Sequence, residues 1–286
     1  MIFAVIVFVL VLAALLWWLL IETEGVYLGR RVVIWLYDVY AGRYDRIKAF
    51  EPEYDFALLA MPIMHAIEPD RTPLVLDVAT GTGRLPKALL NHAAFNGHII
   101  GVDLSRKMLK RAAENLTDLR EWVDLLHSPA ECLHFEDASF DVVTCLEALE
   151  FVSDLDAALD EMIRVLRPGG LMLVTNRINT RWMPGRTYET DTFSEMLADR
   201  GLCEVHSQPW QMDYQRVWAR KAGRYESSQP VALHTILRCP CGDGAVGDDY
   251  PCQNCGRVLN INADGVLEWI SDNSSSRHDR NQRFPH

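Results

Sequence analysis

The hydrophobic pattern begins with a run from Ile2 to Ile21 that contains no charged residue and no proline. Twenty apolar residues in a helix, at a rise of about 1.5 Å each, cover the roughly 30 Å of a hydrocarbon core. A cleaved signal peptide is the alternative, but the basic segment before the apolar run is missing and no small-x-small site follows Ile21. The pattern therefore predicts a transmembrane helix.

The residues beside this run indicate its orientation. Trp17, Trp18 and Tyr27 stand where aromatic side chains meet lipid headgroups. Basic residues follow the run and none precedes it; they are Arg30, Arg31, Arg43, Arg46 and Lys48. Because basic residues stay on the cytoplasmic side, we expect a single-pass membrane protein whose remaining chain, the catalytic domain included, lies in the cytoplasm.

After Pro73, apolar runs of strand length alternate with amphipathic stretches of helical period. The predicted strands are 74–79, 98–103, 122–127, 140–146, 170–176, 203–208 and 214–220. The predicted helices are 85–92, 106–115, 155–166 and 192–200. Strands that alternate with helices predict right-handed βαβ units, and hence an α/β fold with a Rossmann-like parallel sheet and helices on both faces.

The same pattern divides the chain into segments. Bulky apolar residues mixed with Arg and Tyr predict helices near the membrane surface and over the main domain. A cysteine module is expected beyond a linker and outside the βαβ pattern, followed by a polar tail. The predicted segments are the transmembrane helix 1–22, juxtamembrane and lid helices 23–70, the α/β domain 71–223, the linker 224–232, the module 233–270 and a disordered tail 271–286.

The net charge and the positions of the cysteines indicate which partners and metals can be expected. The chain has 28 Lys+Arg against 39 Asp+Glu, a formal net charge of -11. Such a surface repels phosphate backbones, so nucleic acid is not the expected partner. Cys132, Cys145 and Cys203 are scattered, whereas the other four cysteines sit together near the end. This distribution favours a reducing compartment and one metal site over a disulfide framework.

The strand predicted at 74–79 runs directly into a glycine-containing turn that opens a helix. Gly81 and Gly83 let the backbone approach a ligand closely, and the helix N-terminus offers unpaired N–H groups. A dinucleotide site needs a third small residue where Pro86 stands. The carboxylate of Asp77 would repel a pyrophosphate but would hold the ammonium of a methionine moiety. These residues favour S-adenosylmethionine as the ligand.

Asp103 ends the second predicted strand, some twenty residues after the glycine turn. An acidic residue at this place is suited to accept both ribose hydroxyls of an adenosyl group. Leu104 and Met108 are then expected to flank the adenine ring. The alternative for Asp103 is a helix N-cap, a role that Ser105 also suits.

Four stretches carry a resemblance to a known family. DVATGTGR, GVDLSRKML, HSPAECLHFEDASFDVVTCLEALEFV and LRPGGLMLVTNR resemble motifs I, post-I, II and III of class I methyltransferases, most of all the group that methylates quinone rings and small molecules. The resemblance runs from about Tyr37 to Arg220. It implies the class I methyltransferase fold, S-adenosylmethionine as cofactor and methyl transfer as activity.

The resemblance also implies a set of donor-binding residues. Ala79 stands at the first glycine of the family loop, a variation that quinone methyltransferases share. Ser128-Pro129-Ala130 replaces the family's Gly-Asp, which leaves Ala130 and Glu131 as the adenine contacts. Tyr37 and Tyr44 resemble the family's N-terminal lid, with membrane-interface or core aromatics as the alternative. The full set is Tyr37, Tyr44, Asp77, Ala79, Thr80, Gly81, Gly83, Asp103, Leu104, Met108, Ala130, Glu131 and Cys145.

The reaction needs little acid–base machinery, because the donor is an activated sulfonium and catalysis is mostly alignment. Glu147 follows the fourth predicted strand and is the candidate catalytic residue, either as a base or in orienting the acceptor. A solvated carboxylate at a helix start is the alternative. No Asn/Asp-Pro-Pro-Tyr motif of amino-group DNA methylases follows this strand, and Cys145 lacks the Pro-Cys context of a ring-attacking nucleophile.

The last four cysteines form a C-x-C pair and a C-x-x-C pair separated by ten residues. Thiolates paired on two tight turns are typical of a closed structural Zn²⁺ site, here with the ligands Cys239, Cys241, Cys252 and Cys255. The stretch resembles the small zinc-ribbon activators of tRNA, rRNA and release-factor methyltransferases. In those activators the first cysteine pair is usually C-x-x-C. The C-x-C pair of this chain is one residue shorter and so departs from their pattern.

Three functions remain in competition. The first is a membrane-associated enzyme that methylates a small or lipid-like acceptor, of which quinones are one type. The second is an RNA or protein methyltransferase that uses the ribbon as a recognition or activator module. The third, a non-catalytic binder of S-adenosylmethionine, conflicts with the retention of Asp77, Gly81, Gly83 and Asp103. The acceptor stays open because acceptor pockets are built by variable loops, and no oligomeric state is predicted.

Overall fold

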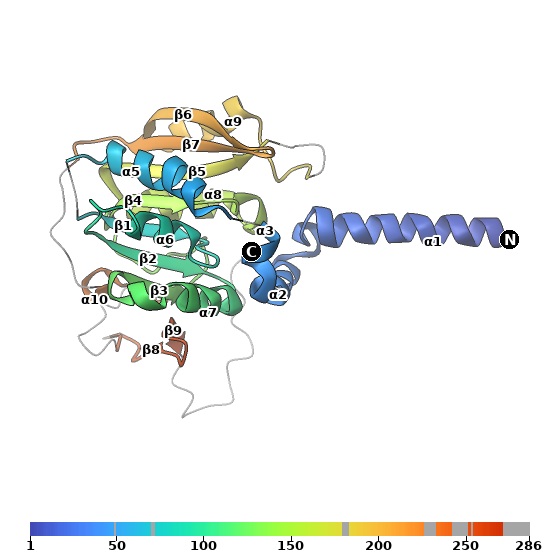
Figure 1. The fold of residues 1–286 in the computed structure, drawn as a ribbon, viewed down its shortest axis with the longest axis horizontal. Coiled ribbons are helices and arrows are strands. Elements are labelled where there is room, and N and C mark those ends of the chain that lie inside the picture. The colour runs from blue at the N-terminus through green and yellow to red at the C-terminus, as the bar shows by residue number, and fades with distance from the viewer. Residues whose placement is uncertain are drawn as a thin grey trace.

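The structure is a computed structural model, and it describes residues 1–48, 50–69, 72–178, 183–225, 233–241, 251–252 and 254–270. Most of the predicted linker 224–232 and all of the predicted tail 271–286 lie outside the described residues. Within the described ranges the centre of the molecule is a sheet in the order β6-β7-β5-β4-β1-β2-β3-β9-β8 (Figure 1). The α/β fold class predicted from the sequence is confirmed.

The strands are β1 Leu74–Val78, β2 His98–Asp103, β3 Val123–His127, β4 Phe140–Cys145, β5 Leu166–Arg177, β6 Leu202–Gln211, β7 Tyr214–Lys221, β8 Val258–Ile261 and β9 Leu267–Ile270. The helices are α1 Ile2–Trp17, α2 Arg30–Tyr40, α3 Tyr44–Lys48, α4 Pro52–Asp55, α5 Met61–Ala66, α6 Arg84–Leu90, α7 Arg106–Asn115, α8 Leu155–Val165, α9 Thr190–Ala198 and α10 Leu233–Ile236.

The sheet is parallel around β1. β1 pairs in parallel with β2 on one side and with β4 on the other, and β7 is antiparallel to both β5 and β6. Every residue of β1 and of β4 is buried, as expected of strands covered on both faces. Strand order reverses at β1, so a crevice for ligands is expected at the carboxyl ends of β1, β2 and β4.

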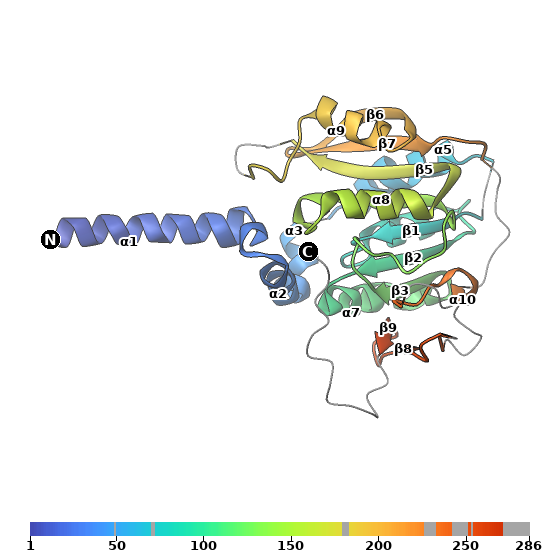
Figure 2. The same cartoon turned by 180° about the vertical axis from the view of Figure 1, so that it is seen from behind.

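Two apolar cores lie against the two faces of this sheet. α8 and α9 contribute buried residues to one core, and α5, α6 and α7 contribute to the other. Figure 1 shows α5 and α6 in front of the sheet, and Figure 2, seen from behind, shows α8 in front of it. The amphipathic helices predicted from the sequence therefore cover the faces that the buried strands require.

α1 projects away from the rest of the molecule (Figure 1). It continues through a π-helical turn to Glu22, and the 18-residue window of highest hydropathy in Ile2–Glu22 has a mean hydropathy of 3.1 and no share buried in the protein. By length and composition this helix meets the criteria for crossing a membrane, which a signal sequence also meets.

The predicted module 233–270, called the cysteine segment from here on, contributes two strands to the main sheet. β9 pairs in parallel with β3 at Leu126 and Leu267, and β8 pairs with β9. Leu259 and Leu267 belong to the same core as α8. Arg106, at the start of α7, contacts Glu268 at 3.1 Å. The sequence predicted a module set apart from the βαβ pattern, whereas the two strands β8 and β9 of this region extend the sheet of the domain at β3.

Candidate functional site

A pocket opens at the carboxyl ends of β1, β2 and β4, beneath α2, with about 800 Å³ of empty space including the solvent at its mouth. Its walls come from the N-terminal lid and from the loops that follow the strands. It brings together residues that the sequence predicted for the donor site and for catalysis, namely Tyr37, Tyr44, Ala79, Gly81, Asp103, Leu104, Met108, Ala130, Glu131 and Glu147.

The loop after β1 turns sharply because three of its residues adopt left-handed backbone angles. These are Ala79 (φ 55), Gly81 (φ 56) and Gly83 (φ 83). Ala79 accepts this conformation at a cost on the order of 1 kcal/mol, which a glycine would avoid. A Cβ on Gly83 would lie 2.7 Å from Leu116, so close helix packing also requires glycine there. The loop thus leads from β1 into α6 with its backbone facing the pocket.

Asp103 links this loop to the second strand. Its carboxylate accepts hydrogen bonds from the backbone N–H of Gly81 at 2.9 Å and from that of Ser105 at 2.8 Å. Ser105 is the N-cap of α7, because its hydroxyl accepts from the N–H of Met108. The capping role considered for Asp103 therefore belongs to Ser105, and Asp103 faces the pocket.

Burial raises the pKa of Asp103 to about 6, against hydrogen bonds that lower it. The pKa of Asp103 in the fold lies above the ordinary value of 3.8, so the folded protein binds a proton at Asp103 that the unfolded chain does not bind between these two pH values. The free energy of unfolding of the donor-free protein therefore increases as the pH falls from about 6 toward 3.8. Ribose hydroxyls need the ionised carboxylate, so we expect the protonation of Asp103 alone to lower the affinity for S-adenosylmethionine by up to about tenfold per pH unit below about pH 6. Calorimetric titrations from about pH 5 to about pH 8 test this. A flat profile would remove Asp103 from donor binding.

A second, smaller cavity continues from the pocket behind the loop, and Asp77 and Thr80 line it. It shares Tyr44, Gly81 and Glu147 with the pocket. Asp77 is buried and accepts a hydrogen bond from the hydroxyl of Thr144 at 2.8 Å. Burial raises the pKa of Asp77 to about 6. Among the described residues no cation forms a salt bridge with Asp77, and a buried carboxylate of this kind attracts a cationic ligand group such as an ammonium.

Two of the predicted donor residues, Gly83 and Cys145, line neither the pocket nor the smaller cavity behind the loop. Gly83 lines a separate cavity with Asp45 and Asn115, where it shapes the loop. The side chain of Cys145 is fully buried in the main core, and burial raises the pKa of its thiol well above the usual value. Cys145 therefore serves packing, as its place in a buried strand indicates.

The lid is α2 together with Tyr44. The rings of Tyr37 and Tyr44 lie 6.1 Å apart, and that of Tyr37 lies edge-on to Phe151 at 5.8 Å. Asp38 accepts a hydrogen bond of 2.6 Å from the Ser105 hydroxyl, which ties α2 to the start of α7. Arg30, Val33 and Ile34 of α2 also line the pocket, and the sequence analysis did not predict them. Their helical spacing from Tyr37, which places all four residues on one face of the helix, is the signal that could have found them.

Glu147 is buried and held by two cationic side chains and an amide. It has a left-handed backbone (φ 51), and its carboxylate contacts Arg84 at 2.7 Å, Lys48 at 3.3 Å and Gln211 at 3.0 Å. The alternative of a solvated helix-start carboxylate is therefore wrong. Because both carboxylate oxygens already accept hydrogen bonds, the geometry suits an orienting role better than that of a free base.

Arg84 organises this side of the pocket, and the sequence reasoning did not single it out. Its guanidinium forms a paired hydrogen bond with Asp55 in addition to the bond with Glu147. The rings of Phe50 and Trp210 lie 4.2 Å and 4.9 Å from it. Residues far apart in the chain thus form one ionic cluster beside the lid.

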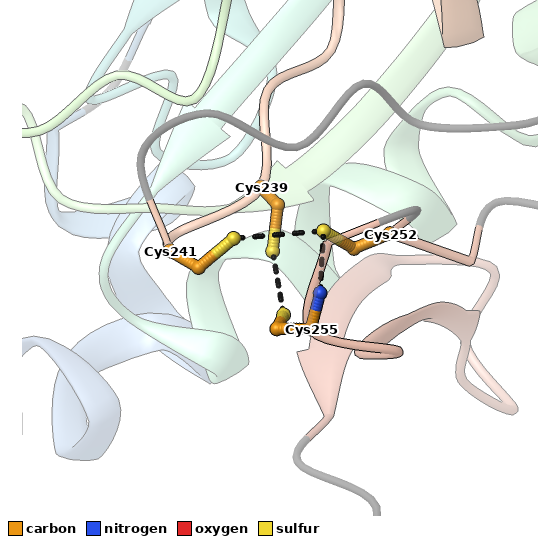
Figure 3. Close-up of side chains that lie close together, drawn as sticks. All are labelled: Cys239, Cys241, Cys252 and Cys255. Carbon is orange, nitrogen blue, oxygen red and sulfur yellow. Dashed lines mark hydrogen bonds between the residues drawn. The ribbon is translucent and has the colours of Figure 1, made fainter.

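Figure 3 shows the four cysteines of the C-terminal segment pointing toward one another. Their Sγ atoms all lie within 4.8 Å of one another, and the pairs Cys239–Cys255 and Cys241–Cys252 are each 3.5 Å apart. Tetrahedral zinc with Zn–S bonds of about 2.3 Å places its sulfur atoms about 3.8 Å apart. The shortened first pair is thus compatible with a four-thiolate site.

Comparisons with known proteins agree with this geometry. Residues 76–174 match the family model described as a methyltransferase domain. A demethylmenaquinone methyltransferase from Clavibacter sepedonicus is 32% identical over 139 residues, 49% of this chain and 55% of that protein. The ubiquinone/menaquinone biosynthesis C-methyltransferase UbiE from Hydrogenovibrio crunogenus is 33% identical over 144 residues, 49% of this chain and 56% of that protein. The chain spans about half the length of these curated relatives.

Solved structures show the same fold. A putative S-adenosylmethionine-dependent methyltransferase from Methanococcus maripaludis has a TM-score of 0.53 at 16% identity, covering 66% of this chain and 94% of that chain. A chain in the complex of the Haloferax volcanii Trm112 methyltransferase activator with a putative methyltransferase has a TM-score of 0.52 at 21% identity, covering 65% and 97%. Motifs, pocket, family match and fold together establish that this chain carries a class I S-adenosylmethionine-dependent methyltransferase domain.

Proposed function

We propose that the protein is an S-adenosylmethionine-dependent methyltransferase, anchored in a membrane, that methylates a small or lipid-like acceptor, with quinone-type rings as the first candidates. The observation that carries this proposal is the pocket in which the loop after β1, Asp103 and the lid of α2 meet. The similarity to a demethylmenaquinone methyltransferase and to a ubiquinone/menaquinone biosynthesis C-methyltransferase supports the choice of acceptor.

In this proposal each part of the pocket takes one part of the donor. Asp103 accepts the two ribose hydroxyls, and Leu104 and Met108 pack against the adenine. Ala130 and Glu131 lie at the adenine edge. Asp77 in the cavity behind the loop holds the ammonium of the methionine moiety, where its negative charge is compensated on binding.

The acceptor then lies between the lid and Glu147. The methyl group moves from the sulfonium to the acceptor, the sulfur keeps the electron pair of the broken bond, and the acceptor loses a proton to solvent or to a base. Arg84 and Lys48 fix the carboxylate of Glu147, so Glu147 orients the acceptor through hydrogen bonds. Alignment of the two reactants supplies most of the catalysis.

The membrane anchor of the proposal is α1. A chain shortened to begin at Gly25 loses the apolar helix, so it should remain in the supernatant of a lysate at high ionic strength, while the full chain sediments with membranes and resists an alkaline wash. Sedimentation followed by immunodetection measures this. Equal sedimentation of both chains at high salt would show that α1 is not what holds the protein on the membrane.

The four cysteines are proposed to hold one structural zinc ion. Four thiolates complete the tetrahedral shell, which leaves no open position for a substrate or a reactive water. The N–H groups of Asn254 and Cys255 point at the sulfur of Cys252 at 3.4 Å and 3.5 Å, which further suits a thiolate. The metal would therefore act on folding rather than on the transfer itself.

The second candidate function is methylation of RNA or protein, with the cysteine segment as a built-in recognition or activator module. The observation in its favour is that β9 joins the sheet edge and that Glu268 contacts the start of α7, close to the donor pocket. The net charge of -11 speaks against an RNA partner.

A single incubation separates these functions and the non-catalytic alternative. Purified full chain in detergent is mixed with S-adenosylmethionine carrying a labelled methyl group and with lipid, RNA and protein fractions of a cell extract. Label in the lipid fraction supports the proposal, and label in RNA or protein supports the second function. Donor binding without label in any fraction would support a binding protein.

A further inference from the structure

The junction between α1 and the domain is tightly packed rather than a free hinge. Trp18 stacks on Tyr27 with ring centroids 5.2 Å apart, and the Tyr27 hydroxyl donates to the carbonyl of Pro184 at 2.7 Å. Thr23 is fully buried and Gly25 donates to the carbonyl of Leu19 at 2.9 Å. If α1 spans a bilayer, as proposed above, this packing also sets how the domain is oriented toward the membrane.

The side of the domain that α1 leaves is the side of the pocket. In both views α1 projects away from the sheet where α2 and α3 lie (Figures 1 and 2). Only seven residues, 23–29, separate the end of the apolar helix from α2. α2 is the lid of the pocket, so the pocket opens close to the membrane surface.

The outer face of α2 is apolar although it is exposed. Trp35 and Val39, one helical turn apart, keep 59% and 53% of their surface in solvent, and Leu28 just before the helix keeps 45%. The opposite face of the same helix, with Val33 and Tyr37, lines the pocket. A large aromatic side chain with one exposed face is typical of helices that lie in a lipid interface.

The segment of residues 26–48 is positively charged, whereas the whole chain is negatively charged. Residues 26–48 contain five basic and two acidic side chains, in a chain whose net charge is -11. Both acidic groups point inward, since Asp38 binds Ser105 and Asp45 binds Thr82. The basic side chains that are exposed are Arg31, Arg43 and Arg46. The outer surface therefore combines apolar and basic groups, which complements anionic lipid headgroups.

We propose that the outer surface of residues 28–47, formed by α2 and the following turns, is a second membrane contact that lies on an anionic bilayer. This inference rests on the membrane anchor of the proposed function. The contact holds the lid at the headgroup layer, so that an acceptor dissolved in the bilayer reaches the pocket beside Phe151 and Val152 without crossing bulk water.

The test uses the full chain in lipid nanodiscs of phosphatidylcholine alone or with added phosphatidylglycerol. We expect amide hydrogen exchange of residues 30–40 to be several-fold slower in the anionic discs at low salt, and this difference to vanish at high salt because the charges are screened. Equal exchange in both kinds of disc at low salt would overturn the second contact.

Matched variants test whether the exposed arginines cause the difference in hydrogen exchange between the two kinds of disc. Arg31→Glu and Arg43→Glu each reverse one exposed charge on the proposed surface, and their combination should abolish the difference between the discs. Arg224→Glu reverses one exposed charge just after β7, near the start of β5 and so at the end of the sheet away from the pocket, and should leave the difference intact. Donor affinity, measured in parallel, should not change. Failure of the chain to insert into either disc would refute the anchor itself, and loss of the difference in the control would refute the assignment to this surface.

Discussion

Asp103→Ala weakens the binding of S-adenosylmethionine by about 1–3 kcal/mol, on the order of tenfold to hundredfold, because the ribose hydroxyls lose their charged acceptor. In the donor-free protein the same carboxylate accepts the backbone N–H groups of Gly81 and Ser105, so the substitution also loosens the loop after β1. Isothermal titration calorimetry of the purified chain measures the affinity, and thermal unfolding shows whether the fold is kept.

Two further variants separate ribose recognition from loop support. Asp103→Asn keeps an oxygen acceptor but loses the charge, so its affinity should lie between those of the wild type and Asp103→Ala. Asp118→Ala removes a carboxylate that is exposed between α7 and β3 and should bind the donor like the wild type. Wild-type affinity in Asp103→Ala would mean that Asp103 does not contact the donor.

Cys252→Ser and Cys255→Ser should each abolish the proposed binding of zinc, because a site of four thiolates loses most of its affinity when it loses one ligand. Structural zinc sites of this kind bind with about 10–16 kcal/mol at neutral pH, so the loss of one of the four thiolates is expected to have a large effect on metal occupancy. Elemental analysis should find one zinc per wild-type chain and none in the variants. The matched controls Cys132→Ser and Cys203→Ser change exposed cysteines elsewhere and should keep the metal. A wild-type chain purified without zinc would contradict the site.

Loss of zinc should also lower the melting temperature. Leu259 and Leu267 of the cysteine segment lie in the main core, and β9 covers the edge of β3. We expect donor binding to survive, because β2, which ends at Asp103, stays paired between β1 and β3, and α7, which carries Met108, also packs with α6 in the second core. Abolished donor binding after chelation would mean that the segment acts as an activator, and would favour the second function.

Local signals account for most of what the sequence predicted of the fold. β2 and α7 match the predicted ranges because a buried strand ends at Asp103 and a serine cap follows it. β5 begins earlier than predicted, at Leu166, because Pro168 and Gly169 look like a turn but form an irregular strand start beside Phe140. The place of β9 was not predictable, since its pairing with β3 joins residues about 140 positions apart and rests on one register pair.

The candidate site also contains residues that the sequence predicts and residues that it does not. Gly81 and Asp103 could be predicted because they stand at the ends of strands whose carboxyl ends must meet in a parallel sheet. The cluster of Asp55, Arg84 and Glu147 could not, because three separate segments bring its members together and none has a sequence signal of its own. Side-chain chemistry at strand ends is therefore readable from sequence, whereas ion pairs between distant segments depend on the packing of the lid.

The proposed reaction is methyl transfer from S-adenosylmethionine to a lipid-like ring. The most direct measurement incubates the full chain in anionic nanodiscs with reduced demethylmenaquinone and a donor whose methyl group is deuterated, followed by mass spectrometry of the extracted lipid. We predict that the quinone gains one deuterated methyl group with the wild type, and far less with Asp103→Ala at limiting donor. An unchanged quinone, with deuterium instead in added RNA or protein, would contradict the account.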